Sequence, residues 1–358
     1  MLTKIEVFDL RLPLKVPYHT AIAEIAEFTT LVVRLEDEAG REGYGETTTI
    51  LGYSWEGPED AWNFALERGP LLLGKETGEA YEKLAGEQDA YPFSVTPWLT
   101  ALEVLEEEPL LRQPDRKTTV PLVGIINAAR TEDIPEKVEE ALAAGYQTLK
   151  FKAGFDVEDD IRRVRALQQA VAGRAKIRID ANQGYNFEQA ARFVTSVDPA
   201  GIELFEQPFE EDAWQAMVEL ARKSPLPLML DESIYHLEDV ERAAGEKCAH
   251  YLKFKLMKAG SARNMARYIK RAQELGLKVV LGNGVAADLG CYHEALVAAN
   301  LGLETAGEEN GFLKPREPLF VKPLEFRNGS IILDPDFKPQ IDRSKLEAYC
   351  LRRAAWQV

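Results

Sequence analysis

The sequence predicts an α/β fold in which a parallel TIM-type (β/α) barrel follows an α+β domain. From about residue 119, short apolar runs alternate with amphipathic helical segments such as DIPEKVEEALAAG and EDDIRRVRALQQAVAG, which is the order of a (β/α) barrel. A chain of 358 residues is also too long for one small core. A doubly wound open sheet is the structural alternative, but no Gly-rich nucleotide loop follows the first of these strands.

Eight apolar runs are the candidates for barrel strands. They are VPLVGII (120–126), TLKFKAG (148–154), AKIRIDAN (175–182), GIELFEQP (201–208), LPLMLDES (226–233), HYLKFKLM (250–257), LKVVLGNG (277–284) and LGLETAG (301–307). Short apolar runs between helical patterns are typical of strands that a parallel sheet buries on both faces.

The region before the barrel, residues 1–118, is predicted to be a separate α+β domain. KIEVFDLRLPL and TTLVVRLEDEAGREGYGE read as strands, and helical patterns follow them up to about Leu111. The polar, proline-containing segment 112–122 marks the boundary. We expect the barrel to span 119–320. A C-terminal segment, 321–358, contains an Asn-Gly turn and a last helix, and we expect it to return to the first domain.

Composition argues against several classes of partner. The net charge of −16 disfavours nucleic acid and an anionic membrane surface, and no apolar run is continuous enough to span a bilayer. The N-terminus alternates like a strand and does not resemble a signal peptide. Three dispersed cysteines, Cys248, Cys291 and Cys350, indicate reduced thiols and a cytoplasmic protein.

Charged residues stand where five consecutive barrel strands end. These residues are Lys152, Asp180, Glu206, Asp231 and Lys255. They are spaced by about one βα unit each, so they fall together at the carboxyl-terminal rim, which carries the active site in this architecture. Any one of these residues alone is more often a helix cap, an ion-pair partner or a lysine that reaches solvent. Five in succession favour a site.

Three adjacent carboxylates between two lysines predict a cation site with acid/base chemistry. Clustered carboxylates need a cation, and an all-oxygen ligand set favours Mg²⁺. Lys150 faces the same way as Lys152 because side chains alternate along a strand. A substrate carboxylate on the metal would hold its α-carbon between Lys152 and Lys255, and Lys150 with the metal would stabilise the resulting enediolate.

With these motifs the chain resembles the enolase superfamily, in particular its muconate-lactonizing-enzyme-like subgroup. The matching segments are LKFK (149–152), IDAN (179–182), FEQP (205–208), LDES (230–233), KFKLMKAG (253–260) and, before the barrel, GYGETTTI (43–50). The resemblance therefore covers nearly the whole chain. It implies a modified (β/α)7β-like barrel and an N-terminal capping domain whose loop near 16–28, with His19, closes over the substrate.

The resemblance also implies a role for each matched residue. Asp180, Glu206 and Asp231 would be Mg²⁺ ligands, Lys152 and Lys255 the acid/base pair, and Lys150 a support for the enediolate. Asn182 and Glu232 would lie beside the substrate or behind the ligands. Residues at the ends of other strands, Asn127 among them, would select the substrate.

Two positions depart from the pattern. Relatives often carry a glutamate at the end of strand seven, where this chain has Asn283. They often carry an uncharged polar residue two positions before the sixth-strand lysine, where this chain has Lys253. Lys253 is interpreted either as a buried partner for a carboxylate such as Glu232 or as an anchor for a second anionic group. The first is favoured because buried ammonium groups usually need a partner.

The leading hypothesis is a Mg²⁺-dependent racemase or epimerase of an N-acylated amino acid or dipeptide, acting through proton abstraction α to a carboxylate. An o-succinylbenzoate-synthase-type dehydratase and a muconate-type cycloisomerase use the same arrangement in the family and remain open. So does a non-catalytic, carboxylate-binding descendant. The segment ETAGEENGFL lacks the Asp-x-Asp pair of dipeptide epimerases and offers Glu308 and Glu309 instead. Four scattered histidines disfavour a metal-dependent hydrolase. A homo-oligomer is possible.

Overall fold

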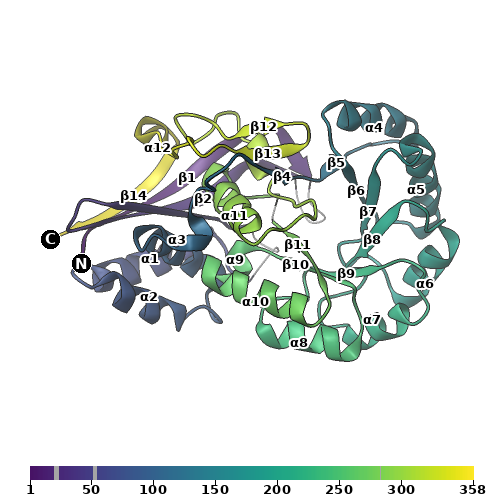
Figure 1. Ribbon diagram of the computed structural model, residues 1–358, viewed down its shortest axis with the longest axis horizontal. Helices are drawn as coiled ribbons and strands as arrows, with labels where there is room; N and C mark the ends of the chain where they lie inside the picture. Colours follow the sequence, from purple (N-terminus) through teal and green to yellow (C-terminus); the bar gives the residue numbers. More distant parts are fainter. Residues whose placement is uncertain (20–23, 51–54, 283) are drawn as a thin grey trace.

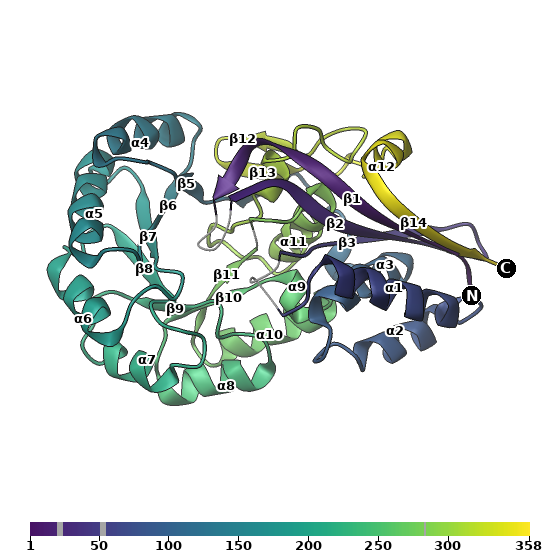
Figure 2. The same cartoon turned by 180° about the vertical axis from the view of Figure 1, so that it is seen from behind.

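The computed structural model describes residues 1–19, 24–50, 55–282 and 284–358. Two lobes lie side by side: a mainly antiparallel sheet with helices on one side, and a curled parallel sheet with helices around its outside (Figure 1). The two chain ends lie together at the far end of the first lobe (Figure 2), where the Val358 N–H donates to the Thr3 carbonyl at 3.1 Å.

The first lobe is a four-stranded sheet covered by three helices. The sheet has the order β14-β1-β2-β3. Its elements are β1 (Leu2–His19), β2 (Glu24–Asp37), β3 (Glu42–Thr48), β14 (Cys350–Gln357), α1 (Pro58–Leu72), α2 (Thr77–Ala85) and α3 (Pro92–Leu105). Helix α3 lies so close to β3 that a Cβ on Gly43 or Gly45 would come within about 2 Å of its backbone, 2.0 Å from Ala101 O and 2.1 Å from Pro97 O. The Gly-x-Gly pattern is therefore a packing requirement.

The second lobe is a seven-stranded sheet whose strands follow one another in chain order and pair in parallel. The strands are β5 (Gly124–Ile126), β6 (Thr148–Lys152), β7 (Lys176–Asp180), β8 (Ile202–Glu206), β9 (Leu228–Leu230), β10 (Tyr251–Phe254) and β11 (Lys278–Leu281). The helices are α4 (Ile134–Ala143), α5 (Val157–Val171), α6 (Phe187–Ser196), α7 (Trp214–Ala221), α8 (Leu237–Glu246), α9 (Leu256–Ala259), α10 (Ala262–Glu274) and α11 (Asp288–Asn300). The predicted α/β barrel with a preceding α+β domain is confirmed.

The predicted eighth strand, 301–307, is not a regular strand. The chain turns after α11 and then contributes a single parallel bridge between Leu122 and Gly307. The Glu308 N–H donates to Leu281 O at 2.8 Å, so this segment fills the gap between β11 and the start of the barrel. A Cβ on Gly307 would lie 2.0 Å from a Glu309 carboxylate oxygen, which shows how sharply the chain bends here. The barrel therefore closes through an irregular segment.

The first predicted barrel strand, 120–126, divides in two. Its first half belongs to β4 (Thr118–Pro121), which pairs with β13 (Ser330–Leu333). The predicted Asn-Gly turn joins β12 (Glu325–Arg327) to β13, and both turn residues have positive φ, as a tight hairpin requires. A last helix, α12 (Arg343–Tyr349), precedes β14, which pairs antiparallel with β1.

Two buried glutamates of the first lobe hold helices of the second. Glu46 on β3 accepts from the Ala287 N–H at 2.6 Å, at the start of α11. Glu103 on α3 accepts from the Ala262 and Arg263 N–H groups at 2.9 and 3.0 Å, at the start of α10. Carboxylates at helix N-termini satisfy orphan N–H groups and complement the helix dipole. These contacts fix the barrel against the first lobe.

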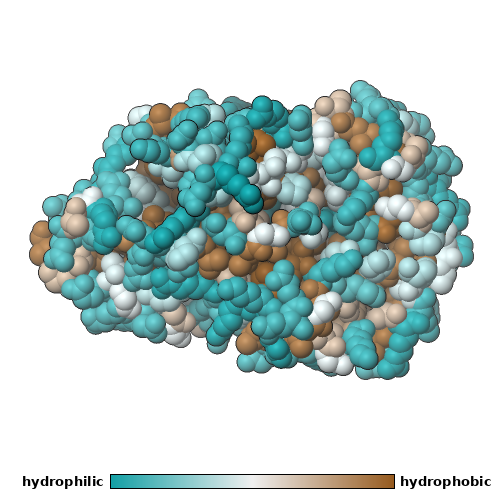
Figure 3. All heavy atoms as spheres, viewed as in Figure 1, coloured by the Kyte–Doolittle hydropathy of each residue, from teal (hydrophilic) through white to brown (hydrophobic). Residues whose placement is uncertain are grey.

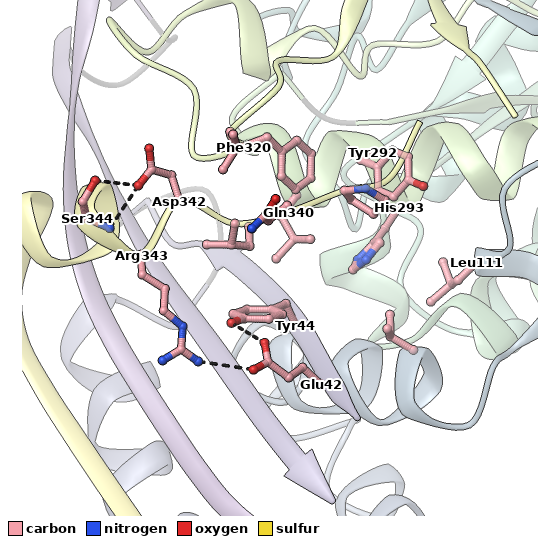
Figure 4. Close-up of a pocket in the computed structure, with 15 residues that line it drawn as sticks. Glu42, Tyr44, Leu111, Tyr292, His293, Phe320, Gln340, Asp342, Arg343 and Ser344 are labelled. Carbon is pink, nitrogen blue, oxygen red and sulfur yellow. Dashed lines mark hydrogen bonds and ion pairs between the residues drawn. The ribbon is translucent and has the colours of Figure 1, made fainter. Parts of the chain in front are cut away.

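A cavity of about 630 Å³ opens where β3, α11 and the segment 339–344 meet (Figure 4). Arg343 and Glu42 form an ion pair at 3.4 Å, and the Tyr44 hydroxyl donates to Glu42 at 2.9 Å. His293 lines the cavity from α11, and burial lowers its pKa to about 4. None of the charged residues predicted at the barrel-strand ends lines this cavity.

The face seen in Figure 3 is mostly hydrophilic, with hydrophobic residues gathered toward its middle. Among the described residues, no helix combines the length and the apolar character needed to cross a bilayer.

The Glu46 contact predicts a pH-dependent stability. Burial, followed by repulsion from Asp288, raises the pKa of Glu46 to about 8 from 4.5. Between these values the folded protein holds a proton that the unfolded chain releases, so the free energy of unfolding of the parent falls as pH rises. Glu46→Gln keeps an acceptor for Ala287 and removes this proton. The unfolding free energy of Glu46→Gln minus that of the parent should rise by about 1 kcal/mol per pH unit from pH 5 to pH 8. Above pH 8 this difference should level off.

Urea unfolding at several pH values measures this difference, with the exposed Glu132→Gln as the control. A Glu46→Gln difference that is constant across the pH range would contradict the assignment.

Candidate active site

The five charged residues predicted at the barrel rim lie on neighbouring strands. Lys152, Asp180 and Glu206 are the last residues of β6, β7 and β8, and the sheet register pairs Lys152 with Asp180 and Asp180 with Glu206. Asp231 follows β9 and Lys255 follows β10 directly. Four of these side chains are buried, and Lys152 is half-buried.

A lysine bridges the first two carboxylates of this row. The Lys150 Nζ lies 2.8 Å from Asp180 Oδ2 and 2.9 Å from Glu206 Oε2. It also contacts Glu308 Oε1 at 2.8 Å, from the irregular segment that closes the barrel. Lys150 therefore faces the carboxylates from the same side of β6 as Lys152.

A second lysine bridges the next two carboxylates. The Lys253 Nζ lies 2.5 Å from Glu206 Oε1 and 3.3 Å from Asp231 Oδ2, and it shares Glu308 Oε1 with Lys150 at 2.8 Å. The favoured interpretation of Lys253 as a buried partner of a carboxylate is supported, but its partners are these three residues. The Glu232 carboxylate instead accepts from the Asn182 amide at 3.3 Å.

Lys255 and Lys258 complete the surroundings of Asp231. The Lys255 Nζ lies 2.7 and 2.8 Å from the two Asp231 carboxylate oxygens. The Lys258 Nζ donates to the Asp231 carbonyl at 2.8 Å and lies 4.2 Å from the centre of the Tyr235 ring. Lys258 was not among the residues predicted from the sequence, although it falls three residues after Lys255 on the next helical turn.

Burial and ion pairing act in opposite directions on these groups. Burial alone would raise the pKa of Asp231, but the three ammonium groups around it, that of Lys255 first, hold its pKa well below the usual range. Burial alone would lower the pKa of Lys253, but its carboxylate neighbours, Glu206 first, raise that pKa well above the usual value for lysine. For Lys258 burial prevails and lowers the pKa to about 8. The network therefore keeps Asp231 and Lys253 charged.

The loops after the strands are held in uncommon backbone conformations. Asn182 and Gln207 have φ of 41° and 35°, in the left-handed region that non-glycine residues rarely adopt. The Asn182 N–H donates to Asp180 Oδ1 at 2.9 Å. Gln207 accepts from the Asp231 N–H at 2.9 Å and donates to the Ser233 hydroxyl at 2.8 Å. Gln207 thus positions Asp231, a role that its place in the FEQP motif could have suggested.

Lys152 and Lys255 differ in their surroundings. Three strands, β7, β8 and β9, separate their strands in the curled sheet, so the two lysines approach the rim from different sides. Lys255 is paired with Asp231. Within the described part of the chain, Lys152 has no ion-pair partner.

The oxygen atoms of this network fit a hard divalent cation. Glu232 Oε2 is buried and accepts no hydrogen bond, whereas Glu206 Oε2 and Asp231 Oδ1 each contact a lysine ammonium group, at 2.9 and 2.7 Å. Among the described residues, however, no three His, Cys, Asp or Glu side chains already converge as a metal cage. The ammonium groups of Lys150 and Lys253 lie between the carboxylates, and a cation would have to displace at least part of that contact.

The other predicted contacts are less well defined. Asn283 lies outside the described residues, as do residues 20–23 of the loop near 16–28, and no side-chain position is described for His19. Asn127 follows β5 and is exposed. Glu308, noted in the sequence only because the Asp-x-Asp pair is missing from its segment, is part of the buried network.

Asp231 should be the carboxylate on which the stability of the metal-free protein depends most. Asp231→Asn leaves three buried ammonium groups with less counter-charge, which is expected to cost about 3 to 5 kcal/mol of unfolding free energy. Asp180→Asn is the matched control, because Lys150 keeps Glu206 and Glu308 as partners, and it should cost clearly less. Urea unfolding in the presence of a chelator measures both variants. Equal losses, or a larger loss for Asp180→Asn, would contradict this account of the network.

Known proteins of one family are similar to this chain. Residues 133–338 match the family described as enolase C-terminal domain-like. The chain is 30% identical to the aromatic dipeptide epimerase of Herpetosiphon aurantiacus, over 89% of this chain and 91% of that protein. It is 26% identical to the N-succinyl-L-Arg/Lys racemase of Bacillus cereus, over 87% and 88% of the two chains.

A solved structure gives the same picture of the whole fold. The muconate lactonizing enzyme of Pseudomonas fluorescens, crystallised with muconolactone, superposes with a TM-score of 0.88 at 25% identity, covering 98% of this chain and 99% of that one. The chain belongs to the enolase C-terminal domain-like family and is an enzyme, an isomerase or lyase, of the muconate-lactonizing-enzyme-like subgroup of the enolase superfamily.

Proposed function

We propose that this enzyme is a racemase or epimerase that removes the proton α to the carboxylate of an N-acylated amino acid and returns a proton to the opposite face. The observation that carries the proposal is the pair Lys152 and Lys255 at opposite ends of a row of carboxylates on one barrel rim. A base on each side of one carbon is what inversion requires. Relatives named as racemases and epimerases support this reaction class.

The two lysines take complementary roles in each direction of the reaction. In one direction the Lys152 amine removes the α-proton, and the Lys255 ammonium delivers its proton to the other face. Asp231 contacts Lys255 and orients it for this step. In the reverse direction the roles exchange. Lys150 stabilises the negative charge that spreads onto the substrate carboxylate when the proton leaves.

The cofactor we propose is Mg²⁺, held by Asp180, Glu206 and Asp231. When bound, it would supply positive charge to the substrate carboxylate and so lower the pKa of the α-proton. The all-oxygen donor set, formed by three buried carboxylates, supports the assignment. Glu232, linked to Asn182, would stand behind these ligands.

Substitution of each lysine should affect proton exchange at a different face of the substrate α-carbon. Lys152→Ala is expected to lose solvent exchange of the α-proton of one enantiomer by about 10² to 10⁴-fold while retaining exchange of the other, and Lys255→Ala should show the opposite preference. Each pure enantiomer of an N-succinyl amino acid is incubated with Mg²⁺ in D₂O, and the α-proton signal is followed by NMR. The exposed Lys137→Ala serves as the control.

Some outcomes would refute this assignment. If both variants still exchange both enantiomers, the two-base arrangement is wrong. If the parent only eliminates water or forms a lactone, the protein is a dehydratase or a cycloisomerase.

We propose an acyl group on the substrate nitrogen because neither glutamate near the barrel closure, Glu308 or Glu309, is available to bind a substrate ammonium group. A dipeptide with a free ammonium group needs a carboxylate partner. Glu308 is engaged by two lysines, and Glu309 has no exposed surface. An N-acylated substrate carries no such charge and needs no such partner.

N-succinyl or N-acetyl amino acids should therefore react with kcat/KM at least tenfold higher than dipeptides with the same C-terminal residue. Racemisation of both series is measured by polarimetry or NMR under the same conditions. A preference for free dipeptides would show that another carboxylate holds the ammonium group.

A further inference from the structure

Lys253 lies where a divalent cation would have to bind. Its ammonium group contacts one oxygen of Glu206 and one of Asp231, at 2.5 and 3.3 Å, and these are two of the three proposed ligands. Lys253 is 1% exposed, so its side chain cannot leave for solvent without opening the barrel. Two cations cannot both contact the same pair of carboxylate oxygens at short range, because they repel strongly in a buried site.

Glu308 offers Lys253 another partner. Its Oε1 lies 2.8 Å from the Lys253 Nζ, and its backbone is fixed by the hydrogen bond from the Glu308 N–H to Leu281. Its carboxylate also contacts the Lys150 Nζ at 2.8 Å, which holds it in place when Lys253 moves. A small rotation of the lysine side chain would keep the Glu308 contact and give up those to Glu206 and Asp231.

We propose that Lys253 and Glu308 form an ammonium gate over the metal site: Lys253 competes with Mg²⁺ for Glu206 and Asp231, and it shifts onto Glu308 alone when the metal binds. This inference rests on the metal site of the proposed function. The gate neutralises the carboxylates while no metal is bound and lowers the affinity for Mg²⁺. Lys253 and Glu308 are positioning residues, because neither is required to contact the substrate.

The gate predicts opposite effects for its two members. Lys253→Met removes the competing charge and keeps most of the side-chain volume, so it should bind Mg²⁺ at least tenfold more tightly than the parent. Glu308→Gln removes the alternative partner and leaves Lys253 on the ligands, so it should bind Mg²⁺ more weakly. Binding is measured without substrate, by calorimetry with MgCl₂ and by electron paramagnetic resonance with Mn²⁺.

Lys258→Met is the matched control. Lys258 carries the same charge and lies 3.5 Å from Asp231 Oδ1, but it donates to backbone carbonyls and does not bridge two proposed ligands. Removing its charge should tighten Mg²⁺ binding less than threefold. Circular dichroism in chelator establishes that each variant is folded, and the opposite sign of Glu308→Gln keeps the test valid if Lys253→Met folds poorly.

The possible outcomes distinguish failure of the gate proposal from failure of the proposed function. Mg²⁺ affinity that is unchanged or weaker in Lys253→Met, or equally tightened in Lys258→Met, overturns the gate. Absence of metal binding in every variant overturns both the gate and the metal site, and α-proton exchange then decides the reaction on its own. Tighter binding by Lys253→Met in a protein that never exchanges an α-proton supports the gate and refutes the proposed function.

Discussion

The constraint on which the site depends is that the buried lysines and carboxylates at the barrel rim pair with one another. Lys150, Lys253 and Lys255 are nearly fully buried, and so are the carboxylates they contact. Breaking such a pair leaves a charge in a medium that solvates it poorly. The charges are also shared: Glu308 Oε1 contacts two lysines, and each of these lysines contacts two of the rim carboxylates. A substitution at one position therefore alters ion pairs on strands from β6 to β10.

Much of the rim could be predicted because the chain repeats. One βα unit separates each charged strand end from the next, and parallel strands in chain order bring those ends together. The partner of Lys253 could not be predicted in the same way. A lysine stem spans more than one layer of the barrel, so Lys253, which sits two residues below Lys255, reaches Glu206 and Asp231 at the rim. The alternation of side chains along a strand predicts which face a side chain lies on, but not how far its end group extends.

Other misses have the same origin in tertiary contacts. Glu308 lies in a segment with no strand periodicity, and it enters the site only because that segment bridges Leu122 and β11. Strand β14 consists of CLRRAAWQ, whose arginine, alanine and glutamine favour helix in isolation; pairing with β1 overrides this preference. The contacts of Glu46 and Glu103 with barrel helices join residues far apart in sequence. No local sequence pattern predicts these contacts.

The difference between Lys152 and Lys255 follows from the same charge arrangement. The Asp231 carboxylate contacts the Lys255 Nζ, whereas no described carboxylate forms an ion pair with Lys152. For a two-base reaction the resting enzyme must hold one lysine protonated and the other free, since two amines cannot donate and two ammonium groups cannot accept. In the proposed reaction, a carboxylate beside only one of the pair distinguishes the two lysines before the substrate arrives.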